Sequence, residues 1–422
     1  MRTRKWLAGA LTVLMLSFAL AGCGSSSSSQ QTQNQGGSQQ QQEQPTQSTP
    51  SKEPVELTVW SHLTTPEVEV VQQVADEWAA KTGNKVTVLE DQTGFQEYAA
   101  AATAGQGPDI MYGLPHDNLG PFWKAGLLEP VPDGVINDSD YEQVTINAVS
   151  FEGQKFAVPI SYEAVALFYN KALVSEPPTV WDDFLALAQE KGFMYKVKDF
   201  YFTYGFIAGS GGYVFKDKGG GNLDPNDVGL ASEGAIAGLQ LLSDFVNKYH
   251  LMPSDVDDNM AKAEFQANNI AFYLSGSWDV KGFEDAGVDF GIAPMPKMPS
   301  GQPFTPFVGV QCAFVSADSK HKEEAWDLIK YLQENVPDKL VSVGNHIPAQ
   351  KSMASALESN KYLPGFAESA KNGHPMPNIP EMSAVWTPAA NMIDLVVTQQ
   401  ATPEQAAQQA VQAINEAVAA MQ

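Results

Sequence analysis

Residues 57–90 read LTVWSHLTTPEVEVVQQVADEWAAKTGNKVTVLE, and this stretch decides the fold class. LTVW (57–60) is a short apolar run that predicts a strand. Thr65-Pro66 predicts the start of a helix, whose apolar residues recur at spacings of three and four until Gly83 ends it. KVTVLE (85–90) predicts the next strand. A strand, a helix and another strand in this order indicate parallel strands joined by a crossover, and so an α/β protein.

The same pattern continues with a predicted helix at 94–104 and a predicted strand in GPDIMYG, 107–113. In open parallel sheets, ligands bind beyond the carboxyl ends of the strands. We therefore expect the site in the loops after Trp60, after Tyr112 and after a strand that ends near Tyr162. These loops read SHLTTPE, GLPHDNLG and SYEAVAL.

A second block of similar texture follows, without a visible internal repeat. The predicted helices and strands of this block are 179–190, 231–249, 270–274, 289–293, 306–316, 322–332 and 401–421. From Val55 onward the composition is that of a globular protein. A body of about 370 residues is larger than one hydrophobic core usually supports, so we expect two lobes.

The N-terminus has the features of a lipoprotein signal. Basic residues precede the apolar run 6–20, which is too short to span a bilayer as a mature helix. The run ends in LAGC (20–23), in which Cys23 would become the lipidated N-terminus after removal of the signal peptide 1–22. The alternative is a soluble secreted protein with a chance cysteine at this position.

Residues 23–54 are rich in Ser and Gln and contain too little apolar surface to fold. We predict a disordered tether with a reach of roughly 30 Å that holds the globular body off a membrane surface. With Cys23 lipidated, Cys312 is the only other cysteine in the sequence, so no internal disulfide can form. Cys312 lies in the strand-like run GVQCAFVS and is predicted to be a small buried hydrophobe.

Several kinds of chemistry lack support in the sequence. The formal net charge of −24 argues against a nucleic-acid partner. There is no GxSxG or GxxxxGK[ST] motif, the six histidines are isolated from one another, and NLDPNDVGL lacks the acidic twelfth residue of a calcium loop. We expect no catalytic residue, no metal and no cofactor, although the sequence does not exclude a glycosidase whose paired carboxylates are distant in the chain.

Six long stretches resemble one protein family. They are GQGPDIMYGLPHDNLGPFWKAGLLEPV, GQKFAVPISYEAVALFYNKALV, YFTYGFIAGSGGYVFK, IAFYLSGSWDVKGF, TPFVGVQCAFV and PMPNIPEMSAVW. Together they are similar to the maltose/maltodextrin-binding proteins of bacterial ABC importers, from about Leu57 to the C-terminus. GPDI and YNK recur in many solute-binding proteins, whereas YEA, YFT, GSW and PNIPEMSAVW are more specific to the maltodextrin branch.

The resemblance implies a two-lobed periplasmic-binding-protein-like fold of type II, with a hinge between the lobes and the ligand in the interlobe cleft. It places 55–161 and 311–359 in the N-lobe, and 162–310 and 360–422 in the C-lobe. The sequence pattern by itself indicates two cores and a parallel first half, but not these crossings.

The resemblance also implies a site for linear α-glucans. Aromatic rings would stack on the apolar faces of glucose, and carboxylates and amides would bind its hydroxyls. Carried over by position, the ligand-binding residues are His62, Asp117, Asn118, Glu163, Tyr201, Phe202, Trp278 and Trp386.

The backbone conformation of PMPNIPEMSAVW (375–386) can be predicted from its prolines alone. Its prolines fix φ and provide no N–H, so the segment predicts a stiff extended approach to a helix. We expect Ser383 or a neighbour to cap that helix, which carries Trp386 in its first turns. The stiff approach would hold the Trp386 ring in place before sugar binds, and so would lower the entropy cost of ordering this side chain on binding.

Trp278, Trp386 and Asp117 also have structural interpretations. Trp278 follows a strand and would fill a core there, although the tight exposed turn predicted at Gly276-Ser277 favours ligand contact. Trp386 has the pattern of a core residue of an amphipathic helix. Asp117 would also serve as a helix N-cap. Glu163 is harder to explain structurally, because an unpaired carboxylate inside VPISYEAVALFYN would be costly to bury.

This sequence departs from the family pattern in the N-lobe loops. Thr64-Thr65 stands where many members have an Asp-Lys pair, and Asn118 stands where an Arg is common. Beyond Trp386, Thr387 and Ala390 replace a Tyr and an Arg. We expect the class of ligand to be the same in spite of these changes. The changes would instead affect the affinity and the preferred length of the oligosaccharide.

The N-terminal features and the family resemblance together imply a monomeric, lipid-anchored receptor on the extracytoplasmic face of the cell membrane. It would capture maltose and maltodextrins by hinge closure and deliver them to the transmembrane permease subunits of an ABC importer. Two alternatives remain open at this point. One is a receptor for another oligosaccharide, such as cyclodextrin or a β-linked sugar, and the other is a surface-anchored glycosidase.

Overall fold

The computed structural model describes residues 53–91, 95–219 and 222–421. The predicted signal peptide, the lipidated Cys23 and nearly all of the predicted tether lie outside these residues. Within the described part of the chain, the helices are all too short or too polar to cross a membrane.

The N-lobe is built around a sheet in the order β14-β6-β13-β3-β1-β2. Its strands are β1 (Glu56–Ser61), β2 (Lys85–Glu90), β3 (Ile110–Pro115), β6 (Val158–Glu163), β13 (Phe307–Val315) and β14 (Ile347–Pro348). β1 is parallel to β2 and to β3, as the sequence predicted. β13 runs antiparallel to both β3 and β6, so β6 points in the same direction as β3. The carboxyl ends of β1, β3 and β6 therefore share one edge of the sheet.

Helix α1 (Thr65–Thr82) covers this sheet and shows why the sequence folds this way. At its start, the N–H and hydroxyl of Thr64 donate to Glu67 Oε2 at 2.8 and 2.7 Å. Val71 and Trp78 lie on the stripe of the helix that is buried against the sheet, and each such side chain contributes about 1.5–3 kcal/mol. Gly83 ends the helix with a φ of 79°, in the left-handed region that glycine adopts at little cost. The predicted bounds of this helix are confirmed.

Most of the remaining N-lobe elements are short. They are α2 (Phe95–Thr103), the 3₁₀ turn η1 (His116–Asn118), α3 (Leu119–Lys124), α4 (Gln143–Ala148), the β4 (Ser150–Phe151) and β5 (Gln154–Lys155) pair, α10 (Lys322–Asn335) and α11 (Pro337–Val343). The predicted strand 107–113 is found a few residues later, as β3. Cys312, at the centre of β13, is fully buried, as predicted.

The C-lobe has a smaller sheet in the order β12-β7-β11-β8. Its strands are β7 (Ala166–Asn170), β8 (Phe193–Met194), β11 (Phe272–Ser275) and β12 (Phe290–Ala293). β7 is antiparallel to both of its neighbours, while β11 and β8 are parallel. A separate antiparallel pair is formed by β9 (Phe215–Asp217) and β10 (Leu223–Val228).

The helices of the C-lobe are α5 (Trp181–Lys191), α6 (Phe200–Gly209), α7 (Glu233–Asn247), α8 (Asp258–Gln266), α9 (Val280–Asp285), α13 (Leu363–Ala370), α14 (Trp386–Val397) and α15 (Pro403–Met421), while α12 (Ala354–Ser359) lies at the end of the second N-lobe range. The 3₁₀ turns η4 (Ser277–Asp279) and η6 (Pro380–Ala384) precede α9 and α14, and β15 (His374–Pro375) pairs with the start of β13.

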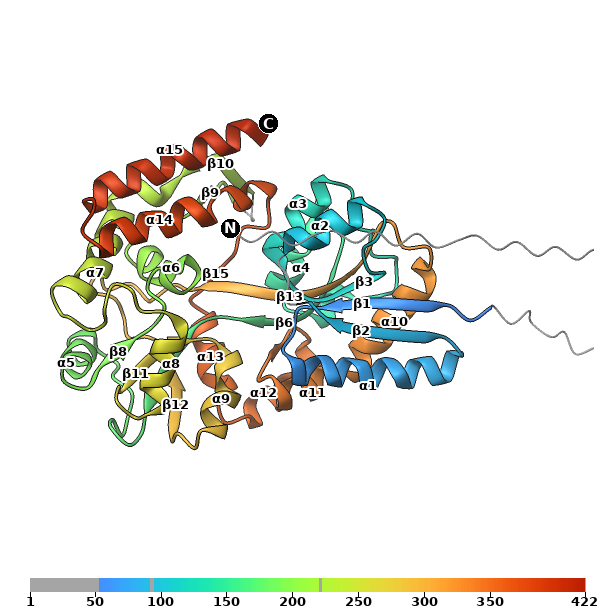
Figure 1. Ribbon diagram of the computed structural model, residues 1–422, viewed down its shortest axis with the longest axis horizontal. Helices are drawn as coiled ribbons and strands as arrows, with labels where there is room; N and C mark the ends of the chain where they lie inside the picture. The colour runs from blue at the N-terminus through green and yellow to red at the C-terminus, as the bar shows by residue number, and fades with distance from the viewer. Residues whose placement is uncertain (1–52, 92–94, 220–221, 422) are drawn as a thin grey trace, which may run out of the picture. The chain divides into compact units, whose positions relative to one another are not determined.

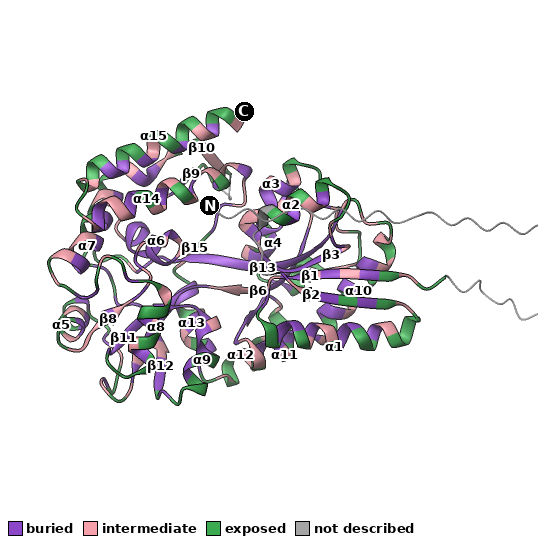
Figure 2. Ribbon diagram, in the orientation of Figure 1, coloured by how far each residue is buried: buried purple, intermediate pink, exposed green. Residues whose placement is uncertain are grey.

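The two lobes have separate cores, which confirms the predicted two-lobed α/β fold. Figure 1 shows β13 and β6 lying between the helices of the N-lobe and those of the C-lobe. Figure 2 shows that buried residues follow the strands and the inner faces of the helices in each lobe. β13 belongs to both cores, because Phe307 at its start stacks on Tyr204 of α6 with ring centroids 3.6 Å apart.

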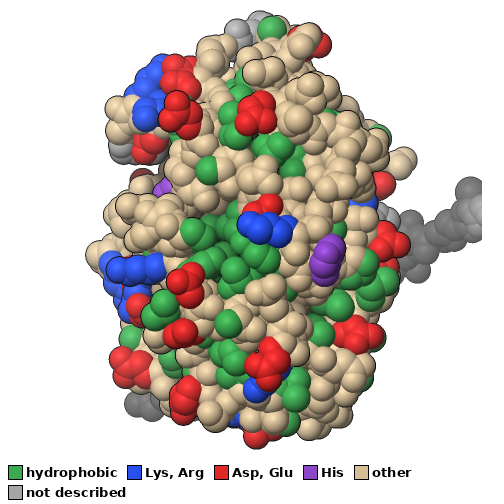
Figure 3. Space-filling view, turned by 90° about the vertical axis from the view of Figure 1, so that its left-hand side faces the viewer, with side chains coloured by type: hydrophobic (Ala, Val, Ile, Leu, Met, Phe, Trp, Pro, Cys, Tyr) green, Lys and Arg blue, Asp and Glu red, His purple; other side chains and the backbone are tan. Residues whose placement is uncertain are grey.

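The surface reflects the acidic composition. Figure 3 shows one end of the molecule, on which acidic side chains are scattered around a central group of hydrophobic ones and basic side chains gather in few places. This distribution agrees with the net charge of −24.

One prediction about the proline-rich segment is wrong. Ser383 does not cap the helix that carries Trp386, because its hydroxyl donates to Pro380 O at 2.7 Å inside η6. The N-cap residue of α14 is Val385, which makes no side-chain capping bond. Trp386 is the first residue of α14. The 3₁₀ turn leads directly into the helix, so the segment reaches it without a polar cap.

Candidate ligand-binding cleft

A cleft of about 1190 Å³ opens between side chains of both lobes. It brings together seven of the eight residues that the sequence singled out. They are His62, Asp117, Asn118, Glu163, Tyr201, Phe202 and Trp386. The eighth, Trp278, is not among the described residues that line this cleft.

The polar wall of the cleft comes from the carboxyl ends of the N-lobe strands. His62 follows β1, and its N–H donates to Tyr112 O of β3 at 3.0 Å, so the two strand ends are held side by side. Asp117 lies in η1 directly after β3, and Glu163 is the last residue of β6. The three loops that the parallel-sheet rule indicated therefore converge on one site.

A neutral histidine fixes the loop that carries Asp117. His116 Nδ1 accepts the N–H of Val310 at 3.0 Å, and its Nε2–H donates to Met376 O at 2.9 Å. Burial lowers the pKa of His116 to about 4, so the ring stays uncharged in this role. One side chain thereby ties β3 to the central strand β13 and to the proline-rich segment.

Asp117 faces an unusual environment for a carboxyl group. It is half-buried, and Asn118 Nδ2 donates to its Oδ1 at 3.2 Å. Loss of hydration raises the pKa of Asp117 to about 7, which a hydrogen bond with Trp386 partly opposes and the nearby charge of Glu163 reinforces. A hydroxyl-rich ligand would supply further donors to this carboxyl.

Glu163 is held by an amide from the central strand. Gln311 Nε2 donates to Glu163 Oε1 at 3.1 Å, while Gln311 Oε1 is buried and has no hydrogen-bond partner among the described residues. The pairing of β13 with β6 is irregular between Gln311 and Cys312, and such bulges redirect side chains near sites. Burial raises the pKa of Glu163, although the charge of His346 and the Gln311 hydrogen bond act in the other direction.

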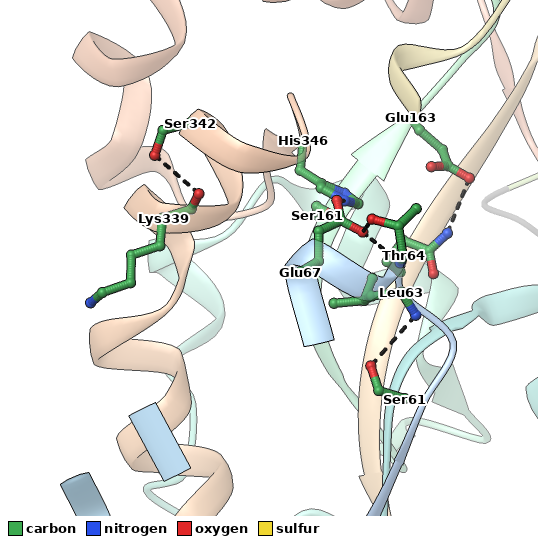
Figure 4. Close-up of polar contacts among 10 residues, drawn as sticks. Ser61, Leu63, Thr64, Glu67, Ser161, Glu163, Lys339, Ser342 and His346 are labelled. Atoms are coloured by element: carbon green, nitrogen blue, oxygen red, sulfur yellow. Dashed lines mark hydrogen bonds and ion pairs between the residues drawn. The ribbon is translucent and has the colours of Figure 1, made fainter. Parts of the chain in front are cut away.

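A buried polar network lies beside Glu163, where three segments of the chain meet. Glu67 Oε1 contacts His346 Nε2 at 2.6 Å, and Ser161 Oγ lies 3.0 Å from His346 Nδ1. Figure 4 shows His346 between Glu67 of α1 and Ser161 of β6, with Glu163 at the end of the same strand. The network joins the start of α1 to β6 and to the segment that precedes β14.

In this network, His346 and Glu67 each favour the charged form of the other. Burial alone would lower the pKa of His346, but its hydrogen bond with Glu67 and the charge of Glu67 raise it. Burial alone would raise the pKa of Glu67, but the hydrogen bonds and charge of His346 and the hydrogen bonds of Thr64 lower it. The arrangement is that of an imidazolium paired with a carboxylate. Ser161 is only 1% exposed, which is unsuitable for a nucleophile.

The aromatic wall comes from the start of α6 in the C-lobe. Asp199 caps this helix by accepting the N–H of Tyr201 at 3.0 Å, and this cap sets the direction of the first turn. Tyr201 and Phe202 both reach the cleft, and the Tyr201 ring is stacked on Phe307 with centroids 6.3 Å apart. The sequence did not predict α6 as a helix, since its nearly continuous aromatic and aliphatic run FYFTYGFIAG has no polar face.

The hydroxyl of Tyr201 is buried and has no hydrogen-bond partner among the described residues. Its pKa is raised well above the usual value by burial and then by the charges of Glu163, Asp117 and Asp199. The phenol therefore keeps its proton and can donate a hydrogen bond to a ligand. An unpaired buried hydroxyl costs about 1–3 kcal/mol, which a ligand hydroxyl would recover.

Trp386 completes the aromatic wall at the start of α14. Its ring makes edge contacts with Phe200 and Phe307, each with centroids 5.9 Å apart. The approach segment is pressed onto the N-lobe, because a Cβ at Gly120 of α3 would lie 2.3 Å from Asn378 O. Asn378 Nδ2 donates to Ala148 O of α4 at 3.1 Å. The Trp386 ring is thus held by Phe200 and Phe307, and the segment that leads to it is held against the N-lobe.

Trp278 lies next to the lining rings. Its ring centroid is 6.2 Å from that of Tyr201 and 6.1 Å from that of Phe202. Unlike its buried neighbours Ser277 and Asp279, Trp278 keeps part of its surface exposed. The indole covers Gly276, where a Cβ would come within 2.1 Å of the ring.

Comparison with known proteins identifies the family. A model of the bacterial extracellular solute-binding proteins matches residues 64–337, more than half of the chain. The chain belongs to this family. It is a family of binding proteins and not of enzymes.

This solute-binding protein is similar to proteins named for oligosaccharides. The crystal structure of the maltose-maltodextrin binding protein of the thermoacidophilic bacterium Alicyclobacillus acidocaldarius is 42% identical, covers 85% of this chain and 99% of its own, and superposes with a TM-score of 0.82. A maltooligosaccharide ABC transporter solute-binding lipoprotein of Streptococcus pneumoniae (strain ATCC BAA-255 / R6) is 29% identical over 96% of each chain. A galactooligosaccharide-binding protein of Bacillus subtilis (strain 168) is 32% identical over 73% of this chain and 76% of its own.

Several lining residues of this solute-binding protein were not predicted from the sequence. Lys196, Asp199 and Met376 also line the cleft, and Lys196 pairs with Asp199 at 2.8 Å. Asp199 had a detectable signal, because an Asp just before an apolar run is typical of a helix N-cap. Gln311, which is not a lining residue but holds Glu163, had no such signal, since a glutamine in an apolar strand gives no indication of which group it faces.

The cleft combines hydrogen-bonding groups with flat apolar rings. No group of three or more side chains suited to a metal ion occurs among the described residues. Carboxylates and amides on one wall and aromatic rings on the other match a pyranose, which carries hydroxyls around its rim and C–H groups on its faces.

Proposed function

We propose that this protein captures maltodextrins in the cleft and delivers them to the permease of an ABC importer. The observation that carries the proposal is the joint placement of Asp117 and Glu163 opposite Tyr201 and Trp386 in one cleft. The maltodextrin names of similar proteins support the choice of ligand. His62 and Asn118, also in the cleft wall, would add hydrogen bonds.

In this proposal, rings and carboxylates act together on each glucose unit. Trp386, Tyr201 and Phe202 cover apolar sugar faces, and Trp278 extends this surface through its contacts with Tyr201 and Phe202. Asp117 and Glu163 accept hydroxyl hydrogens, and the protonated Tyr201 donates one. A micromolar dissociation constant requires only about −8 kcal/mol, which two or three stacked rings and several hydroxyl contacts can supply after ordering costs.

Ligand binding would draw the lobes together. We place the N-lobe at 55–161 and 311–359 and the C-lobe at 162–310 and 360–422. The boundary between 161 and 162 is supported by two consecutive strands, since β6 belongs to the N-lobe sheet and β7 to the C-lobe sheet. A bound sugar would contact both walls of the cleft at once and would therefore increase the population of the closed form. The permease would recognise this closed form.

The N-terminal sequence supports a location for this receptor. Removal of residues 1–22 and lipidation of Cys23 would anchor it on the extracytoplasmic face of the membrane, with 23–54 as the tether. The receptor would act as a monomer, since a single chain contributes both walls of the cleft. It would bind its ligand without catalysis.

The proposal is tested by calorimetric titration with glucose, maltose, maltotriose, cyclodextrin and cellobiose. We expect the malto-oligomers to bind and cellobiose not to bind. Trp386→Ala should weaken maltotriose binding by about tenfold or more, because it removes an apolar stacking surface whose burial contributes about 1.5–3 kcal/mol. Trp181→Phe, in the C-lobe core, is the matched control and should bind like the wild type. Equal affinity of Trp386→Ala and wild type would show that the site is elsewhere.

A second candidate ligand follows from the relative named for galactooligosaccharide. The N-lobe loops of this chain depart from the maltodextrin pattern at Thr64, Thr65 and Asn118, so a different oligosaccharide would fit the same two walls. Galactooligosaccharides and cyclodextrin in the same titration decide between these ligands. The glycosidase alternative predicts turnover, which chromatography of maltotriose after prolonged incubation would reveal as shortened products.

A further inference from the structure

A buried charge lies directly beside Trp278. Asp279, the next residue, is only 7% exposed, and it terminates the 3₁₀ turn that follows β11. A buried carboxylate is costly unless its oxygens are paired. The cleft does not contact Asp279 and none of the functions above uses it, so its presence needs another explanation.

Both oxygens of Asp279 are fully engaged. Lys262 Nζ of α8 lies 2.8 Å from Oδ1. Tyr273 Oη and Ser275 Oγ of β11 donate to Oδ2 at 2.8 and 2.6 Å. Lys262 also pairs with Asp258 at 2.6 Å within α8. The carboxylate therefore connects the turn to a strand and to a helix at the same time.

The partners of Asp279 are different residues from the rings that Trp278 contacts. Trp278 is the one partly exposed residue in the described turn Ser277–Asp279, and its indole contacts Tyr201 and Phe202. Gly276 leaves room for the ring to fold back over the backbone. Trp278 thus lies between a residue held by an ion pair and hydrogen bonds, Asp279, and a glycine that its ring covers, Gly276, and both neighbours limit the orientation of the indole.

We propose that Lys262 and Asp279 are positioning residues for Trp278, which they hold against the cleft-lining rings of Tyr201 and Phe202 so that it can stack on ligand. The inference rests on the proposed oligosaccharide-binding function. Lys262 neutralises the buried carboxylate, and the carboxylate fixes the backbone of the turn. Without the cation, Asp279 would turn towards water, and the indole would lose its fixed orientation.

The test is a double-mutant cycle on maltotriose affinity, measured by calorimetry. Lys262→Met should weaken binding by about fivefold, and Lys262→Arg, which keeps the cation, should restore most of it. In a Trp278→Ala background, Lys262→Met should have no further effect, because the residue that it positions is gone. The matched control is Lys322→Met, which breaks the 2.6 Å ion pair with Glu129 in the N-lobe and should leave affinity unchanged.

A spectroscopic measurement reports on Trp278 independently of sugar. In protein labelled with 5-fluorotryptophan, the resonance that disappears in Trp278→Phe identifies this residue. Lys262→Met should shift or broaden that resonance in the sugar-free protein and leave the others in place. A general loss of folding would instead move all of them.

The outcomes separate the two proposals. Wild-type protein that binds no oligosaccharide would overturn the proposed function, while the Trp278 resonance would still test the positioning. Wild-type affinity in Lys262→Met would overturn the inference alone. Additive losses in the double variant would also overturn it, because they would show that Lys262 acts through some residue other than Trp278.

Discussion

Replacing Asp117 with asparagine should make the sugar-free protein more stable at pH 8. The carboxyl has its pKa raised from 3.8 to about 7, so folding favours its protonated form. The folded state is therefore penalised when the group is charged. This penalty is complete above pH 7, shrinks as the pH falls through 7, and vanishes near the unfolded pKa of 3.8. Asparagine carries no charge and avoids the penalty.

The magnitude follows from the pKa shift. The rise from 3.8 to about 7, at about 1.4 kcal/mol per pKa unit, sets an upper limit of about 4 kcal/mol at pH 8. Asp117 is only half-buried, and water in the open cleft screens its charge. We therefore expect a gain of about 1–2 kcal/mol in the free energy of unfolding at pH 8. At pH 5 the gain should be less than half of that value.

Urea unfolding followed by circular dichroism, without sugar and at both pH values, measures this difference. Asp318→Asn replaces an exposed carboxyl and is the matched control, for which we expect no gain. A loss of stability in Asp117→Asn at pH 8 would refute the reasoning, because it would mean that the folded protein stabilises the charged carboxylate. A gain of equal size at pH 5 would also contradict it.

The same substitution should have the opposite effect on binding. An amide is a weaker acceptor for a sugar hydroxyl than a carboxylate, and its NH₂ group would place donors where the carboxylate of Asp117 offers acceptors alone. We expect maltotriose affinity at pH 8 to decrease by about tenfold, since hydrogen bonds to charged groups contribute about 1.5–3 kcal/mol. The site would then be an example of binding capacity maintained at the expense of stability.

Three further changes probe the surroundings of the cleft. His346→Gln should reduce the free energy of unfolding most between about pH 4.5 and 6.5, because His346 is then charged in both the folded and the unfolded state and Glu67 is ionised. The loss of stability should diminish as the pH rises through the raised pKa of His346. Urea titrations at pH 5.5 and pH 9 measure the difference. Gly120→Ala should lower the melting temperature and weaken maltotriose binding, because its Cβ would meet Asn378 O at 2.3 Å and displace the approach to α14, at a cost of about 1–3 kcal/mol. Tyr201→Phe should raise the apo melting temperature by removing an unpaired buried hydroxyl and weaken sugar binding severalfold; calorimetry that showed unchanged affinity would exclude this hydroxyl as a ligand donor.

The N-lobe was largely predictable because its sequence signals are local. In 57–90, strand runs and helical spacing alternate, and Thr65-Pro66 and Gly83 mark the ends of α1. Alternation of this kind also gives the parallel pairing of β1 with β2 and β3. The parallel pairing in turn indicates the loops that carry His62 and Asp117. The rule about strand ends therefore found half of the site without any knowledge of the family.

The C-lobe half of the site was not predictable in the same way. Helix α6 is apolar on all sides, since it packs between the C-lobe core and β13, and such a run lacks the periodicity of an amphipathic helix. Tyr201 and Trp386 were singled out only through the resemblance to a family. The contacts of Glu163 with Gln311, and of Asp279 with Lys262, join residues that are distant in the sequence, and no local pattern reveals them.

β13 links the thermal behaviour of the two lobes. Its middle residues pair with β3 and β6 in the N-lobe sheet, while Phe307 at its start stacks face to face on Tyr204 in the C-lobe core. If either core melts, one end of this strand loses its support and the other is weakened. Scanning calorimetry of the sugar-free protein should therefore show one cooperative endotherm, with equal calorimetric and van't Hoff enthalpies, even though each lobe has a core of its own.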